Sequence, residues 1–134
     1  MYDKIDAQLK VQRHALNLLV QRQEMLASNI ANADTPHFKA RDIDFKDALA
    51  SRLAGQADGS LMLARSRPGH LSGQSAVLPA NTRYRTEFQP GVDGNTVNMD
   101  VERAAFAENA LRLEAALTFV RGSLKDLQTA LSQQ

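Results

Sequence analysis

Helix-breaking residues are concentrated in the middle of this chain, and this constrains its fold more than any other feature. Six of the seven glycines and three of the four prolines lie between residues 55 and 95. Because helix interiors tolerate glycine and proline poorly, the clean flanks favour two long helices joined by an irregular segment. We therefore divide the chain into 1–54 (a long helix, a turn and a short helix), 55–95 (a flexible loop with a small β segment) and 96–134 (a second long helix). The first and last parts are expected to form one domain.

Both flanks place apolar residues at the alternating steps of three and four that build a coiled-coil seam. The N-terminal series is Ile5, Leu9, Gln12, Leu16, Leu19, Gln23, Leu26, Ile30 and Ala33, and the C-terminal series is Phe106, Ala110, Leu113, Leu117, Val120, Leu124, Leu127 and Leu131. The predicted fold is therefore mostly α, with two long antiparallel terminal helices packed along these series. Pro36 should end the first helix near Ala33 or Asp34, and Asn98 or Asp100 should cap the second.

A second apolar line runs beside each series. Its members are Val11, Ala15, Leu18 and Met25 in the first helix and Ala107, Leu111, Ala115 and Phe119 in the second. A hairpin of two helices covers only one line per helix. The short helix expected over 44–53, with Phe45, Ala48, Leu49 and Leu53 on one face, is only about 15 Å long and cannot cover the rest. We therefore expect the terminal helices to be poorly ordered in a free chain and to become ordered in an assembly.

The middle of the chain is predicted to hold a flexible loop followed by a β-hairpin. Residues 55–80 are rich in glycine, serine and alanine, a composition typical of segments that do not form a core of their own. Residues 82–88 and 94–99 flank the turn signals Pro90-Gly91 and Asp93-Gly94. We therefore expect those two segments to pair as short strands.

The composition favours neither an enzyme nor a metal or nucleic-acid site. The net charge is +1, cysteine is absent, and the three histidines are scattered along the chain. Asp42, Asp44 and Asp47 lack the glycine and final glutamate of a calcium loop, so we interpret them as a solvated turn and helix start. The pairs Arg65 with Arg67 and Arg83 with Arg85 are interpreted as solvated loop residues, with an acidic partner or cell-wall polymer as the alternative. We predict no cofactor.

The apolar runs are too short for a membrane span or for the apolar core of a secretory signal peptide. The longest are four residues, whereas a span needs about 20 and a signal about 7 to 15. We therefore expect neither membrane insertion nor export by the general secretory route.

The end of the first predicted helix contains two asparagines three residues apart. Asn29 and Asn32 therefore share one helix face, and we hypothesise that their amides bond the main chain of a neighbouring helix. The small residues around them permit close approach of another backbone. The alternative is a frayed helix end followed by a proline stop, without any further role.

Three stretches resemble one known family. The run Ser28-Asn29-Ile30-Ala31-Asn32-Ala33-Asp34-Thr35-Pro36, followed by Phe38-Lys39, resembles the N-terminal signature of the flagellar rod, hook and hook-associated axial proteins. The continuation Ala40-Arg41-Asp42-Ile43-Asp44-Phe45 is similar to the proximal rod members of that family. Asp93-Gly94-Asn95-Thr96-Val97-Asn98-Met99-Asp100 resembles the entry into their C-terminal helix. His37 stands where the family most often has glycine, so either this turn keeps a negative φ or His37 is strained.

The resemblance implies a structural subunit of the bacterial flagellar basal-body rod in the periplasmic space. Such proteins polymerise by packing terminal helices around the axis of a torque-transmitting tube. They are exported by the flagellar type III apparatus without a cleaved signal peptide. The implied partners are other copies of the chain, other flagellar rod proteins and the export-gate or adaptor components at the rod base. The alternative function is a soluble coiled-coil adaptor or secretion chaperone that binds one client through its helix pair.

Two groups of residues are predicted to carry the assembly function. The predicted subunit interface comprises Leu9, Leu16, Leu19, Leu26, Asn29, Ile30, Asn32, Phe106, Leu113, Leu117, Val120, Leu124 and Leu127. The predicted turn motif comprises Asp34, Thr35, Pro36, His37 and Phe38.

Overall fold

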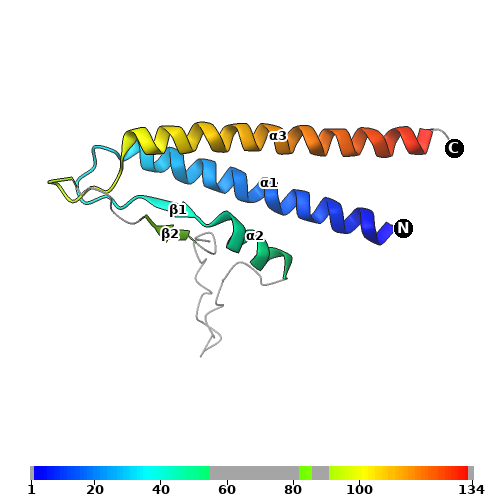
Figure 1. Cartoon of the computed structure of the whole chain (residues 1–134), viewed down its shortest axis with the longest axis horizontal. Helices are drawn as coiled ribbons and strands as arrows, with labels where there is room; N and C mark the ends of the chain where they lie inside the picture. Colours follow the sequence, from blue (N-terminus) through cyan, green and yellow to red (C-terminus); the bar gives the residue numbers. More distant parts are fainter. Residues whose placement is uncertain (1, 55–81, 86–90, 133–134) are drawn as a thin grey trace, which may run out of the picture.

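The computed structural model describes residues 2–54, 82–85 and 91–132, and within these it forms a long antiparallel helical hairpin with smaller elements along one side. The elements are α1 (Tyr2–Ala31), β1 (Arg41–Ile43), α2 (Phe45–Leu53), β2 (Thr82–Tyr84) and α3 (Met99–Ser132). α1 and α3 lie side by side, and both chain ends lie at the same end of the hairpin (Figure 1). The predicted mostly α fold with two long terminal helices is confirmed.

Polar side chains set the helix starts. The Oδ1 atom of Asn98 accepts hydrogen bonds from the N–H groups of Asp100 (3.1 Å) and Val101 (3.3 Å), so Asn98 rather than Asp100 caps α3. Asp44 likewise caps α2 by accepting from the N–H of Asp47. α1 ends at Ala31, slightly before the predicted end, because the chain tightens into turns there.

The predicted β-hairpin is wrong in its pairing. β2 pairs antiparallel with β1, in the register Arg41↔Tyr84 and Ile43↔Thr82, and not with residues 94–99. The latter segment forms a turn and the cap of α3, with Gly94 in the left-handed region at φ 74°. Its polar groups are thereby used and cannot serve a strand ladder. The expected flexible loop at 55–80 and the remainder of the predicted first strand at 86–88 lie outside the described residues.

The apolar core lies between α1, β1 and α2, close to the turn end of the hairpin. Leu18 and Met25 of α1 pack with Ile43 of β1 and Ala48 of α2, and Phe45 and Leu49 lie against them. The second apolar line of α1 is thus largely covered by its own chain. The described side chains of residues 6–17 and 110–132 include none that is buried. The half of the hairpin near the chain ends therefore has no core.

α3 turns a different face toward α1 than the sequence predicts. Phe106, Leu113, Val120 and Leu127 are partly buried, as expected for the seam. The alternating positions, which we call the leucine line, are Ala110, Leu117, Leu124 and Leu131. Leu117 and Leu124 are 39% and 51% exposed, respectively, and lie outside the packed seam. Their expected places facing α1 are taken by smaller or polar residues, including Asn109 and Ser123, which hydrogen bond to α1.

The second apolar line of α3 remains in solvent, as the sequence predicts. This outer line consists of Ala107, Leu111, Ala115 and Phe119, all of them exposed. Within α3 the buried side chains are Glu102 and Asn109, and both are polar. None of the helices in the described ranges has the length and apolar character needed to cross a membrane.

Candidate functional site

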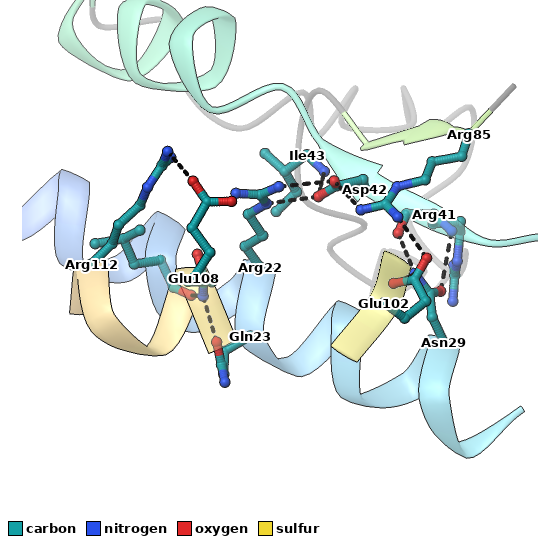
Figure 2. A network of polar contacts seen from close by, with 12 residues as sticks. Arg22, Gln23, Asn29, Arg41, Asp42, Ile43, Arg85, Glu102, Glu108 and Arg112 are labelled. Carbon is teal, nitrogen blue, oxygen red and sulfur yellow. Dashed lines mark hydrogen bonds and ion pairs between the residues drawn. The ribbon is translucent and has the colours of Figure 1, made fainter. Parts of the chain in front are cut away.

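A network of ion pairs ties α1, β1, the segment after β2 and α3 together at the turn end of the hairpin (Figure 2). Arg22 of α1 binds the carboxylate of Asp42 in β1 through two hydrogen bonds, Nε to Oδ1 at 2.9 Å and Nη2 to Oδ2 at 3.0 Å. Two parallel bonds of this kind fix both the distance and the orientation of the two groups. The pair therefore sets how β1 lies on α1.

Arg85 extends the network to α3. Its Nη2 donates to Oδ2 of Asp42 and its Nη1 donates to Oε1 of Glu102, each at 2.7 Å. The side chain of Glu102 is 1% exposed, so its charge depends on these protein partners for compensation. Two arginines and two carboxylates balance, and among the residues that the structure describes Arg85 is the one that connects the carboxylate of β1 with that of α3.

The charges of the network shift the pKa values of two members. Burial raises the pKa of Asp42, but hydrogen bonds from Arg22, Arg85 and the Ile43 N–H outweigh this effect and hold the pKa below its ordinary value. The hydrogen bond to Asp42 raises the pKa of Arg22 against the opposing effect of burial. The pair is therefore ionised in the folded chain at neutral pH.

Asn29 acts as a substitute peptide group beside β1. Its Oδ1 accepts from the N–H of Arg41 at 3.1 Å, its Nδ2 donates to the carbonyl of Arg41 at 2.7 Å, and Nδ2 also donates to Oε2 of Glu102 at 3.2 Å. The hypothesis that this amide bonds the main chain of a neighbouring helix is wrong. Its main-chain partner is Arg41, in the strand that follows the turn. Asn32 bonds the Ser28 carbonyl of its own helix and accepts from Thr35.

Sequence reasoning missed this network because its members looked like surface residues. Asp42 and Arg85 were interpreted as solvated, whereas their side chains are only 19% and 24% exposed. A signal of a buried polar face was available in Glu102, which precedes Asn109 by two helical turns and so lies on the same side of the helix. By contrast, Arg83 and Asp47 pair at 2.9 Å on the surface, where the interpretation as solvated residues is appropriate.

Asn95 closes the end of α1. It is 6% exposed, and its Nδ2 lies 3.0, 2.7 and 2.9 Å from the carbonyl oxygens of Asn32, Ala33 and Thr35, to which it donates. Its Oδ1 accepts from the N–H of Val97 at 2.8 Å. These three residues follow the last residue of α1, so this side chain ties together the turn by which the chain leaves the helix.

The turn motif is strained at His37. This residue has φ 60°, in the left-handed region that favours glycine, which resolves the question the sequence left open. The conformation lets the His37 N–H donate to the carbonyl of Asp93 at 3.1 Å, and the Phe38 carbonyl accepts from Thr96. Asp34, Thr35, Pro36 and His37 are exposed. The turn motif thus joins the end of α1 to the segment before α3 through its main chain.

The predicted interface residues fall into three groups. Those buried inside the chain are Leu19, Leu26 and Asn29. Those partly exposed along the helix pair are Leu9, Leu16, Ile30, Asn32, Phe106, Leu113, Val120 and Leu127. Leu117 and Leu124 are exposed on α3, beside the outer line. The free apolar surface therefore gathers on α3.

The comparisons agree with this architecture. The family described as Flagella basal body rod protein matches residues 9–39, which span most of α1 and the turn motif. The flagellar basal body rod protein FlgB of Escherichia coli (strain K12) is 44% identical over 134 residues, covering 98% of this chain and 97% of the relative. FlgB of Yersinia enterocolitica is 46% identical over 138 residues, covering 99% of each chain, and FlgB of Cereibacter sphaeroides is 41% identical over 124 residues, covering 92% and 93%.

Identity at this level over nearly the whole length leads to one assignment. The chain belongs to the FlgB family of flagellar basal body rod proteins, and is a structural subunit of the rod rather than an enzyme.

Proposed function

We propose that α3 is the principal assembly surface of this rod subunit, and that its leucine line and outer line are covered by other copies of the chain. The observation that carries the proposal is that α3 buries two polar side chains and no apolar one. A helix of 34 residues gains its stability mainly from packing, so the aliphatic side chains that α3 leaves exposed favour a further surface that covers them.

The exposed surface is large enough to drive assembly. Five side chains of α3, Leu111, Leu117, Phe119, Leu124 and Leu131, are between 39% and 74% exposed. Together their exposed parts equal about three complete side chains, so burying them contributes about 5 to 9 kcal/mol per subunit. This is comparable with the whole stability of a small domain.

The distribution of the core supports ordering on assembly. Residues 6–17 and 110–132 contain no buried side chain, so these halves of α1 and α3 depend on neighbours more than the turn end does. We infer that these halves open more often than the turn end in the free chain and become fixed in the rod. On this proposal residues 1–54 and 96–134 act as one axial domain.

The finer address of the protein is also a proposal. The relatives are flagellar basal body rod proteins, which supports assembly of this chain with flagellar rod components. We propose that the chain occupies the proximal rod in the periplasmic space, where it helps to transmit torque. It contacts other rod proteins and the export-gate or adaptor components at the rod base. Export through the flagellar type III apparatus, without cleavage of the N-terminus, is consistent with a chain whose core is small. This assignment replaces the coiled-coil adaptor or chaperone alternative.

A single substitution tests the assembly surface. Leu117→Asp places a charge on the leucine line, and it should abolish swimming of a strain whose own rod subunit has been deleted, while the purified chain stays soluble. The matched control is Leu53→Asp, because Leu53 lies on α2 and is 48% exposed, a value similar to the 39% of Leu117. The control strain should swim normally.

The assay separates an assembly defect from a folding defect. Basal bodies isolated from the Leu117→Asp strain should lack a complete rod, and the circular dichroism of the free variant should match that of the parent. Normal rods in that strain would rule out α3 as the principal assembly surface. Loss of swimming with both variants would show that any charge on an exposed leucine is harmful, and would equally overturn the proposal.

A further inference from the structure

One buried amide on α3 is used incompletely. Asn109 has no exposed surface, and its Nδ2 donates to the carbonyl of Leu19 at 2.9 Å and to Oε1 of Gln23 at 2.6 Å. Its Oδ1 atom is buried and has no hydrogen-bond partner among the described residues, and the same is true of Oε1 of Gln12. Buried polar atoms without partners are costly, so their presence at the α1–α3 contact requires an explanation.

The same contact is not the one that hydrophobicity favours. The most apolar stripe of α3 runs through Leu113, Val120 and Leu127 and the leucine line. The face that actually packs on α1 lies on the other side of Leu113, Val120 and Leu127. It is centred between these three residues and the line of Glu102, Asn109 and Ser123. At about 100° per residue the two faces differ by about 40° around the helix axis. A rotation of this size would place Leu117 and Leu124 against α1.

We propose that Asn109 is a positioning residue for assembly: its two hydrogen bonds to α1 hold α3 in the rotation that keeps the leucine line away from α1 and free for a second copy of the chain. This inference rests on the assembly function proposed above. A polar residue at a seam position is known to fix the register of paired helices at a cost in stability. Here it fixes rotation, and the partnerless Oδ1 atom is part of that cost.

The contacts between α1 and α3 in the half near the chain ends allow such a rotation. Near the chain ends the contact between α1 and α3 is open, with a groove of about 290 Å³ lined by Gln8, Leu9, Gln12, Ser123, Asp126 and Leu127. The Gln12 Nε2 atom donates to the Ser123 Oγ atom at a long 3.4 Å. Close packing therefore does not lock α3 in this half. Glu102 holds the start of the helix through Arg85 and Asn29, and beyond it the hydrogen bonds of Asn109 are the stronger constraint on the orientation of α3.

Thiol reactivity in the free chain tests the inference. The chain has no cysteine, so a single cysteine introduced at position 123 or at position 124 is a unique reporter. With Asn109 present, the thiol at 124 should react with a maleimide faster than the thiol at 123, because Ser123 is partly buried and Leu124 is 51% exposed. In the Asn109→Ala background the ratio of the two rates should fall below one.

The two reporters are adjacent, and this separates rotation from fraying. Fraying exposes both positions and accelerates both reactions, which would show that Asn109 merely stabilises the hairpin and would overturn the inference, as would an unchanged ratio. Asn17→Ala, at an exposed position of α1, is the matched control and should leave the ratio as it is. Because the measurement uses the unassembled chain, its result is independent of whether Leu117→Asp blocks the rod.

A second measurement links the rotation to assembly. Asn109→Ala should reduce the swimming of the deletion strain although the variant chain is folded by circular dichroism. If the thiol ratio inverts while the strain swims as the parent does, the rotation has no role in assembly and the inference fails at that step.

Discussion

Arg85 and Glu102 should be strongly coupled, and a double-mutant cycle measures this coupling. Arg85→Met keeps the aliphatic stem but removes every donor, which leaves the Glu102 carboxylate 1% exposed with only the 3.2 Å contact to Asn29. Stranding a buried charge in this way costs about 3 kcal/mol of unfolding free energy, the low end of the usual range because Arg85 is 24% exposed.

The Glu102 single variant should be milder than Arg85→Met, and the double variant should cost less than the sum of the two single variants. Glu102→Gln leaves Arg85 paired with Asp42 and open to water on one side, so it should cost about 1 to 2 kcal/mol. In the double variant no buried charge is stranded, so its cost should fall below the sum of the single costs by at least about 1 kcal/mol. Urea unfolding followed by circular dichroism at neutral pH gives all four values.

Arg83→Met is the internal control for this cycle. Arg83 lies two residues from Arg85, on the strand itself, and pairs with Asp47, but these side chains are 64% and 53% exposed. An exposed pair contributes about 0 to 1 kcal/mol, so this variant should unfold almost as the parent does. Additive costs for Arg85 and Glu102, or an Arg83 cost as large as that of Arg85, would refute the view that the network holds β2 to α3.

Three further predictions concern the turn end of the hairpin. Asn95→Ala removes a buried donor from the carbonyls of the turn after α1, of which that of Thr35 keeps a bond from the Phe38 N–H, and should lower the free energy of unfolding by about 1 to 3 kcal/mol in the same urea assay. His37→Gly relieves the left-handed φ of 60° and should raise it by up to about 1 kcal/mol, whereas Gly94→Ala should lower it, because the added Cβ would lie 2.9 Å from the His37 ring. The pKa of Asp42 is held below its ordinary 3.8, so the folded chain binds fewer protons there than the unfolded chain. The contribution of Asp42 to stability should therefore be constant above about pH 5 and fall as the pH drops through 3.8 toward the folded pKa, and Asp42→Asn should remove this part of the dependence.

The long helices were predictable because their signals are local and repeated. The heptad steps and the absence of breakers predict α1 and α3, and Asn98 predicts the start of α3 to within one residue. The short helix also follows from its own residues, with Asp44 as cap and Ala48 facing the core. Each of these features depends on residues close together in the chain.

The polar network and the rotation of α3 depend on residues far apart in the chain. Nothing near Asp42 indicates that Arg85 and Arg22 converge on it, because hydropathy treats all three as surface residues. The sequence predicts that the leucine line faces α1, because this prediction uses only the spacing of apolar residues. It takes no account of polar contacts such as the hydrogen bonds of Asn109. The predicted strand pairing was wrong for the same reason. β2 pairs with a strand far away in the chain, Arg83 opposite Asp42, and no local turn signal indicates such a pairing.

The concentration of the core at one end has a mechanical consequence. Because both termini lie at the opposite, coreless end, tension on either terminus peels α1 from α3 one turn at a time, as a zipper opens. In a rod assembled as proposed above, load along the axis would instead shear each helix past its neighbours, so that many contacts would resist at once. On that proposal, the same subunit opens readily when it is pulled by one terminus and resists load once it is assembled.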